Sequence, residues 1–216
     1  IIVRNKFQLQ VRENEGKKLN MGYDKRCIVK PSVPIEKVTE VSTLPFGHVG
    51  VYEKEFTETD PPNFDFNNGS FYSGSKALEQ KVLEPFMHKS YLFRIRMPFG
   101  NDKHPKNLLT KLENYQKLFA MPNSVSYVPD VARAVVYFVL NKPEYGIYNV
   151  CNPGITSAMV IAEYMGLKKE WYTPDEFKQA VVAPRSNCIL NTNKLQNVFP
   201  IMDAKSAIKL AVENYK

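Results

Sequence analysis

The stretch Asn68-Gly-Ser-Phe-Tyr-Ser-Gly-Ser-Lys-Ala-Leu-Glu-Gln-Lys81 decides how this chain is interpreted. If the chain is helical from about Phe71, Tyr72 and Lys76 lie four residues apart and therefore share one face, one turn from each other. A neighbouring ammonium favours the tyrosinate form, which lowers the pKa of the phenol and makes it a better proton donor or acceptor near neutral pH. Tyr72 and Lys76 are therefore a candidate catalytic pair.

Spacing alone is weak evidence, because a second Tyr-Lys pair has it too. Tyr164 and Lys168 are also four residues apart, but Gly166 falls between them, where a helix would end. Small residues alone separate Tyr72 from Lys76. The first pair is favoured as a site, and the second is interpreted as the end of a helix.

The segments around this stretch follow one another in a recognisable order. They are Pro62-Asn-Phe64, Gly69-Ser-Phe-Tyr-Ser73, Arg94-Ile-Arg-Met-Pro98, Pro105–Lys111, Met121–Ser124, Gly146–Gly154 and Val182–Asn187. Together they resemble the extended short-chain dehydrogenase/reductases. The resemblance is closer to their rhamnose synthase branch, the bifunctional 3,5-epimerase/4-reductases that act on nucleotide-linked 4-keto-6-deoxyglucose. It runs from about Phe56 to the C-terminus and is poor before that residue.

The resemblance implies an α/β fold: a Rossmann-like doubly wound sheet, incomplete at its N-terminal side, with a small substrate lobe. We expect residues 1–147 to form the core that carries Tyr-x-x-x-Lys, and residues 148–216 to form a mainly helical substrate-binding lobe, with segments that interleave. The shift toward short helices after about Tyr148 agrees with this division. A ligand would then bind in the cleft between the two parts.

The same resemblance assigns catalytic roles. Tyr72 would donate a proton to the substrate oxygen, and Lys76 would hold the nicotinamide ribose. Thr43, with Ser42 as second choice, would hydrogen-bond the substrate carbonyl, although a hydroxyl that caps a loop is an equal alternative. Lys111 would assist epimerisation, because its distance in sequence from Tyr72 equals that of the family's lysine. This role requires burial to lower the pKa of Lys111.

The resemblance also implies contacts for the cofactor and the substrate. Arg96, Met97 and Pro98 would bind the cofactor together with the catalytic pair. The strand from Tyr91 to Pro98 carries two arginines and leads into a polar loop, where a doubly wound fold places its ligands. For Arg94, a solvated basic edge remains the alternative.

The resemblance assigns the substrate to three residues. They are Asn107, Arg185 and Asn187. An arginine fork matches phosphate oxygens well, which favours Arg185 for the nucleotide diphosphate. A salt bridge to a structural acid is the alternative.

Two features depart from the family. Pro45 stands two positions beyond Thr43, where the family has an acid/base cysteine, so epimerase activity is left open. No glycine-rich pyrophosphate-binding turn is present, since Gly16 and Gly22 are isolated. The family segment before the tyrosine is also longer than the 71 residues here. Either the N-terminal half is missing from this chain, or cofactor binding has been lost.

The composition limits which other classes of protein this chain can belong to. The chain has 216 residues, 44% of them hydrophobic, a net charge of +7 and a pI near 9.2. Its Lys and Arg residues are interspersed with acids, which disfavours nucleic-acid binding and suits phosphate-bearing ligands. No apolar run approaches the ~20 residues that cross a bilayer, and no signal peptide is visible, so we expect a cytoplasmic protein without membrane contact. The three cysteines, Cys27, Cys151 and Cys188, fit reduced thiols, and we expect no metal site.

Local patterns predict most of the other elements. A strand is expected over 38–43, a helix over 107–119, a strand from Asn123, and a helix over 131–140 with Asp130 as its N-cap. Ser157 should cap a helix that Gly166 ends. Thr173-Pro-Asp-Glu176 reads as a capping box, and a final helix should run over 203–215.

The prediction is a reductase that completes rhamnose formation. With NADPH (or NADH), it would reduce the C4 ketone of a UDP- or dTDP-linked 4-keto-6-deoxyhexose, with 3,5-epimerisation left open. The partner would be the nucleotide sugar, and the chain could form a homodimer. The alternatives are a reductase or epimerase of another nucleotide sugar, or a non-catalytic Rossmann-like scaffold or regulatory subunit.

Overall fold

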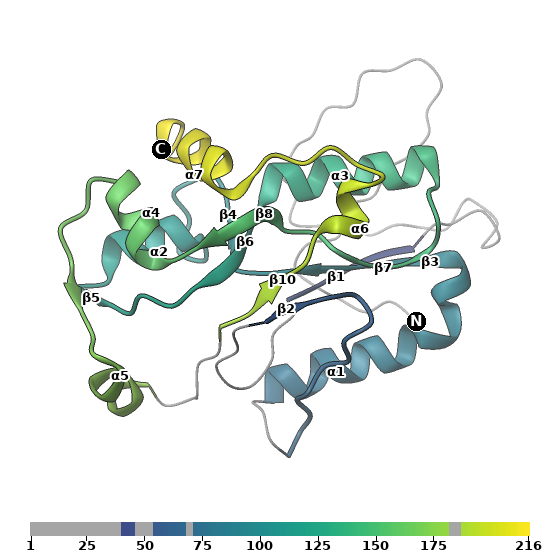
Figure 1. Cartoon of the computed structure of the whole chain (residues 1–216), viewed down its shortest axis with the longest axis horizontal. Helices are drawn as coiled ribbons and strands as arrows, with labels where there is room; N and C mark the ends of the chain where they lie inside the picture. Colours follow the sequence, from purple (N-terminus) through teal and green to yellow (C-terminus); the bar gives the residue numbers. More distant parts are fainter. Residues whose placement is uncertain (1–39, 46–53, 68–70, 182–186) are drawn as a thin grey trace.

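The computed structural model describes residues 40–45, 54–67, 71–181 and 187–216, with side chains from residue 54 onward (Figure 1). Its centre is a parallel sheet in which β1 (Glu40–Pro45) pairs with β3 (Ser90–Ile95), and β3 pairs with β7 (Gly146–Asn149). Helix α1 (Phe71–Leu83) covers one face of this sheet and α3 (Val128–Asn141) covers the other (Figure 1). Parallel strands with helices on both faces are the doubly wound arrangement that the sequence predicted.

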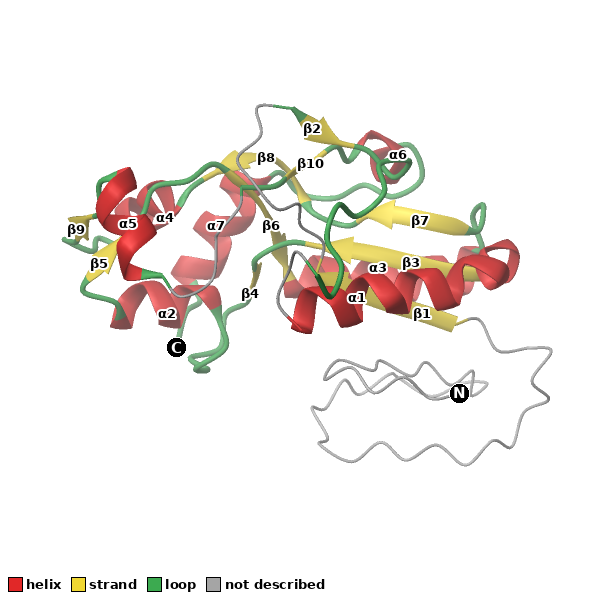
Figure 2. Ribbon diagram, turned by 90° about the horizontal axis from the view of Figure 1, so that it is seen from below, coloured by secondary structure: helices red, strands yellow, loops and turns green. Residues whose placement is uncertain are grey.

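A second group of strands continues from the carboxyl ends of the first. β4 (Pro98–Phe99) pairs in parallel with β6 (Asn123–Tyr127), and β6 pairs antiparallel with β8 (Asn152–Thr156). Figure 2 shows these strands beside α2, α4 and α7, away from β1 and β7. The remaining helices are η2 (Glu84–Lys89), α2 (Leu108–Asn114), α4 (Ala158–Tyr164), α5 (Pro174–Ala180), α6 (Asn193–Gln196) and α7 (Ala204–Glu213). Two short parallel strand pairs complete the described structure. They are β2 (Glu55–Phe56) with β10 (Ile189–Leu190), and β5 (Lys117–Leu118) with β9 (Glu170–Trp171).

Two large hydrophobic clusters match the two groups of strands. The cluster at the first sheet is aromatic: Phe93 and Phe138 meet edge to face, with their ring centroids 4.9 Å apart. The second cluster is mostly aliphatic and draws residues from β4, α2, β6, α4 and α7. Segments before and after residue 147 both contribute to it, so the two groups interleave along the chain.

Gly74 lets the segment before α1 lie directly against the helix. A Cβ at this position would lie 2.6 Å from the Phe66 ring and 2.9 Å from its backbone nitrogen. Only a residue without a side chain permits so close an approach. Gly74, between Tyr72 and Lys76, therefore serves the packing of the residues that lead into the helix.

Most helix ends follow the sequence signals. Ser157 accepts a hydrogen bond from the Val160 amide at the start of α4. Gly166 follows the end of this helix with φ +66°. Thr173 and Glu176 form the reciprocal capping box. The predicted caps at Ser157 and Thr173 are thus confirmed. Asp203 caps α7, which was not predicted from the sequence.

The predicted role of Asp130 as an N-cap is wrong. Helix α3 begins at Val128, which places Asp130 inside the first turn, where its buried carboxylate accepts hydrogen bonds from Asn152 and Arg133. The Asn152 amide also donates to the Met202 carbonyl (2.9 Å) and accepts from the Tyr127 amide (2.7 Å). Asn152 therefore joins α3, β6 and the segment before α7.

The helix predicted over 107–119 is shorter than expected. It ends at Asn114, and Lys117–Leu118 pairs with Glu170–Trp171 instead. The Lys169 ammonium donates to the carbonyls of Glu113 (2.7 Å) and Tyr115 (2.6 Å) at this helix end. A cation at the carboxyl end satisfies carbonyls that the helix leaves unpaired. Lys169 lies more than fifty residues from Glu113 and Tyr115 in the sequence.

Within the described segments, no helix has the length and apolarity needed to pass through a membrane.

Replacing Asn152 with Ala should destabilise the fold by about 2–4 kcal/mol, because three buried partners would lose their hydrogen bonds. Urea unfolding followed by circular dichroism measures this difference. The matched control is Asn141→Ala, since Asn141 is exposed and donates one bond to Tyr137, so a loss below about 0.5 kcal/mol is expected. Equal losses in the two variants would contradict the role given to Asn152.

Candidate active site

Tyr72 and Lys76 lie one turn apart at the start of α1, as the spacing predicted. The Lys76 ammonium is 5.7 Å from the centroid of the Tyr72 ring. The two side chains differ in exposure: Tyr72 is 55% exposed, whereas Lys76 is buried. A partly exposed phenol next to a buried ammonium can exchange protons with a ligand while the ammonium stays fixed.

A third residue of the same helix changes the electrostatics of the pair. Glu79 accepts a 2.8 Å ion-pair hydrogen bond from Lys76, and both side chains are buried. Burial and the negative charge of Glu79 raise the pKa of Tyr72 above its ordinary value. The expected lowering of the Tyr72 pKa is therefore wrong for this structure, because burial and the charge of Glu79 both disfavour the tyrosinate form.

Sequence reasoning missed Glu79, although a signal was available. Lysine and glutamate three residues apart on a helix form ion pairs, and Lys76 and Glu79 have this spacing. Pairs of this kind are common on exposed helix faces, so burial of both groups is what sets this one apart.

Arg94 is neither a ligand contact nor a solvated edge, and both expectations are wrong. Its side chain has no exposed surface. One nitrogen donates to the Thr57 carbonyl (3.1 Å) and another to the Gln80 side chain of α1 (3.2 Å). Burial lowers the pKa of Arg94 to about 10, and nearby Glu58 and Asp60 act in the opposite direction. Arg94 is thus protonated at neutral pH and links β3 to α1.

Arg96, Met97 and Pro98 follow Arg94 at the carboxyl end of β3. Two nitrogens of Arg96 donate to the Asn123 side-chain oxygen, at 3.0 and 2.9 Å. Met97 has φ +41°, an unfavourable backbone conformation for a residue with a side chain. Pro98 begins β4. The unusual backbone lies where open parallel sheets bind their ligands.

Asn107 is half-buried at the start of α2. Its oxygen caps the helix and its nitrogen donates to the carbonyls of Gly100 and Asp102, both at 2.8 Å. Lys111 is exposed on α2, so the burial that its predicted role requires is not present. These contacts show what the two residues do within the fold, and their roles toward a ligand stay predictions.

The other predicted residues are described less fully. Thr43 lies in β1, opposite Phe93 of β3. The side chains of Ser42 and Thr43 lie outside the part of the chain that is described, and so does all of Arg185. Asn187 is buried next to Cys188, whose amide donates to the Asn123 oxygen. The described cysteines, Cys151 and Cys188, are both buried free thiols, as expected.

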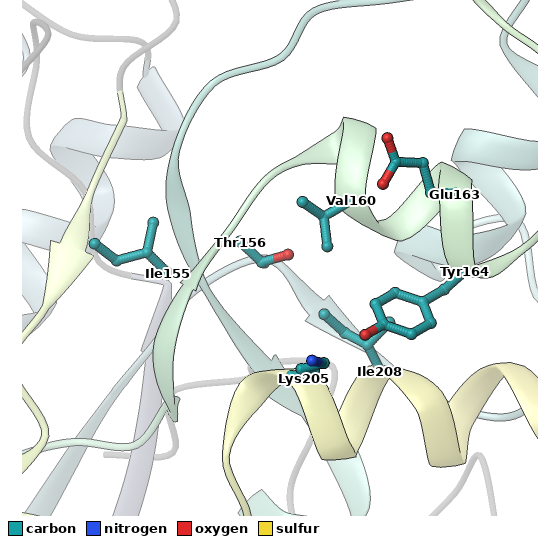
Figure 3. A pocket seen from close by; sticks show the side chains of 7 residues that line it. All are labelled: Ile155, Thr156, Val160, Glu163, Tyr164, Lys205 and Ile208. Atoms are coloured by element: carbon teal, nitrogen blue, oxygen red, sulfur yellow. The ribbon is translucent and has the colours of Figure 1, made fainter.

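A hollow of about 480 Å³ lies elsewhere, in the second group of strands (Figure 3). It is lined by residues of β8, α4 and α7, and none of the predicted site residues belongs to it. In the described parts of the chain, no three His, Cys, Asp or Glu residues are grouped as metal ligands.

Glu79→Gln should lower the pKa of Tyr72. The substitution removes a negative charge that raises this pKa and releases the Lys76 charge toward the phenol, so both effects favour tyrosinate. Carbon-13 NMR of labelled tyrosine, titrated over about pH 8–12, reports the change. The tyrosine signal that is missing from the spectrum of Tyr72→Phe is the signal of Tyr72.

Glu84→Gln is the control for this titration, because Glu84 is an exposed carboxylate shortly after α1. It should leave the Tyr72 signal where it is. An unchanged or higher pKa in Glu79→Gln would show that Glu79 does not act on the phenol.

Comparisons with known proteins agree with this geometry. A bifunctional dTDP-4-dehydrorhamnose 3,5-epimerase/dTDP-4-dehydrorhamnose reductase of Arabidopsis thaliana is 36% identical over 170 residues, which cover 74% of this chain and 55% of the relative. A trifunctional UDP-glucose 4,6-dehydratase/UDP-4-keto-6-deoxy-D-glucose 3,5-epimerase/UDP-4-keto-L-rhamnose-reductase of the same plant is 34% identical over 152 residues, or 67% of this chain and 22% of the relative. The chain thus spans about half of the first relative. No protein-family model matches the chain.

A solved structure has the same architecture. The crystal structure of the L780 UDP-rhamnose synthase from Acanthamoeba polyphaga mimivirus matches with a TM-score of 0.74 and 27% identity, over 83% of this chain and 66% of that one. Sequence and fold therefore agree. This chain is therefore similar in sequence and fold to the rhamnose synthase branch of the extended short-chain dehydrogenase/reductases.

Proposed function

We propose that this protein reduces the C4 ketone of a UDP- or dTDP-linked 4-keto-6-deoxyhexose, the reduction that completes rhamnose formation. The observation that carries the proposal is the exposed Tyr72 phenol, one turn from a buried Lys76, on the helix beside β3. The named activities of the relatives supply the substrate class. The proposal includes a cytoplasmic location and a homodimer.

The described residues suit one end of a nicotinamide cofactor. The phenol, the ammonium and the unusual backbone of Met97 lie along the carboxyl side of the sheet, where parallel strands bind ligands. The 216 residues contain no glycine-rich turn for the pyrophosphate. Bound there, NADPH or NADH would supply a hydride to C4. Lys76 would hold the nicotinamide ribose, and Arg96, Met97 and Pro98 would line the same site.

Tyr72 would donate its proton to the C4 oxygen as that oxygen becomes negatively charged. A proton donor must be protonated before the reaction, and the raised pKa of Tyr72 keeps it so at neutral pH. Thr43, at the level of Phe93 in the neighbouring strand, would hydrogen-bond the same oxygen. Glu79 would hold the Lys76 ammonium in a position from which it can contact the ribose.

The three proposed substrate contacts and Lys111 differ in how far the structure describes them. Arg185 would bind the diphosphate, with Asn187 nearby in sequence. Asn107 would act through the loop that it holds, since its amide is engaged with Gly100 and Asp102. Lys111 is exposed beside this loop, so epimerisation by Lys111 would require a bound substrate to bury it.

Tyr72→Phe should lower kcat for reduction by about 100-fold or more in the full-length protein, because a positioned proton donor contributes roughly that factor. Tyr115→Phe is the matched control, since Tyr115 is also 55% exposed but lies after α2. Its activity should be unchanged. Loss of NADPH in the presence of the 4-keto sugar, followed by absorbance, measures both.

Binding separates the enzyme from a non-catalytic scaffold. Titration of NADPH fluorescence should show binding by the full-length protein, weakened by at least about tenfold in Tyr72→Phe combined with Lys76→Ala, which removes two contacts with the nicotinamide ribose. A full-length protein that binds no NADPH would overturn the reductase and favour the scaffold.

A further inference from the structure

Tyr215, which follows α7, joins the last segment of the chain to α2. Its hydroxyl lies 2.7 Å from the Thr110 hydroxyl and donates a 3.2 Å hydrogen bond to the Glu113 carboxylate. Because a phenol has one proton, Thr110 is the donor in the first of these bonds. The Lys103 ammonium donates to the other carboxylate oxygen of Glu113 (2.9 Å) and lies 5.6 Å from the centroid of the Tyr215 ring. Tyr215 thus holds one face of a helix that lies more than one hundred residues earlier in the chain.

The backbone of the same segment pairs with residues 100–107, the β4–α2 loop. The Lys103 amide donates to the Lys216 carbonyl (2.7 Å), and the Lys216 amide donates to the Asn101 carbonyl (3.1 Å). Figure 2 shows the end of the chain beside this loop and α2. The hydrogen bond from Lys103 lowers the pKa of Glu113 below its ordinary value, so this carboxylate is charged at neutral pH. Backbone, hydroxyl and charged groups therefore join the loop, α2 and the segment after α7.

The β4–α2 loop is also anchored on the side of the sheet. The Asn101 side chain accepts a hydrogen bond from the Tyr127 hydroxyl of β6 (2.7 Å). Asn107 donates to the carbonyls of Gly100 and Asp102, both at 2.8 Å, and caps α2 with its oxygen. Tyr127 thus fixes the start of the loop, and Asn107 closes the loop on itself. A further support comes from the segment after α7.

We propose that Tyr215 is a positioning residue for the nucleotide sugar. Through Thr110 and Glu113, it sets where α2 and the β4–α2 loop stand. The loop ends at Asn107 and α2 carries Lys111, and both belong to the substrate side of the proposed function. Tyr215 acts through these two elements and not by contact with the sugar. This inference rests on the proposed function and adds a residue to it.

These contacts predict an effect on the substrate side of the site alone. The residues proposed to bind the cofactor lie on α1 and around the end of β3, whereas Tyr215 binds α2 and its backbone neighbour binds the preceding loop. A displaced β4–α2 loop would weaken binding of the sugar and leave the cofactor in place. A role in stability alone predicts something different. It lowers the amount of folded enzyme, and with it the apparent kcat, but leaves the KM of the folded enzyme unchanged.

Removing the Tyr215 hydroxyl tests this role. In the full-length protein, Tyr215→Phe should raise the KM for the 4-keto sugar by about five- to tenfold, the effect of about one hydrogen bond on binding. The kcat should stay within about twofold and the dissociation constant of NADPH should not change. Thr110→Val should change KM in the same direction. The double variant should raise KM by less than the product of the two single effects, because both substitutions remove the same hydrogen bond. Loss of NADPH absorbance at increasing concentrations of the 4-keto sugar measures kcat and KM.

Tyr148→Phe is the matched control, since the hydroxyl of the buried Tyr148 donates a hydrogen bond to the Glu144 carbonyl, before β7 (2.7 Å). It should leave KM unchanged, and a rise equal to that in Tyr215→Phe would overturn the role given to Tyr215. An active protein in which Tyr215→Phe and Thr110→Val keep the original KM, whatever their kcat, would overturn this role alone. A full-length protein that does not reduce the 4-keto sugar would overturn the proposed function, and this role with it.

Discussion

The buried guanidinium of Arg94 fixes the position of the candidate catalytic helix. A charge without exposed surface is costly to bury unless acceptors surround it. Arg94 meets this requirement with the Thr57 carbonyl and the Gln80 side chain, near the charges of Glu58 and Asp60. The turn before α1 and α1 itself are thus both tied to β3. Since Tyr72 lies two turns before Gln80, the sheet determines where the phenol stands.

The electrostatics of α1 favour a proton donor over a proton acceptor. With Glu79 paired to Lys76, the ammonium no longer acts on Tyr72 as an uncompensated positive charge, and burial adds to the raised pKa of the phenol. A protonated phenol can give a proton to a carbonyl oxygen that gains charge, as reduction requires.

Sequence predicted the features of this fold that are decided within one helical turn. The caps at Ser157 and Thr173 depend on neighbours three residues away, and both were predicted correctly. Features decided over longer distances were not. Asp130 was predicted as an N-cap because its carboxylate lies near a helix start. In the structure, this carboxylate accepts a hydrogen bond from Asn152 of β8. The burial of Arg94 depends on segments before α1 that no periodicity reveals.

The candidate site shows the same division between near and distant interactions. The spacing of Tyr72 and Lys76 was visible in the sequence, whereas the partners of Arg96 were not. The Asn123 oxygen accepts two hydrogen bonds from Arg96 and one from the Cys188 amide, 65 residues further on. One buried amide therefore joins the strand end proposed to contact the cofactor to the segment that carries the proposed substrate contact at Asn187. Arg96 therefore uses these hydrogen bonds to link the end of β3 to Asn123 within the protein.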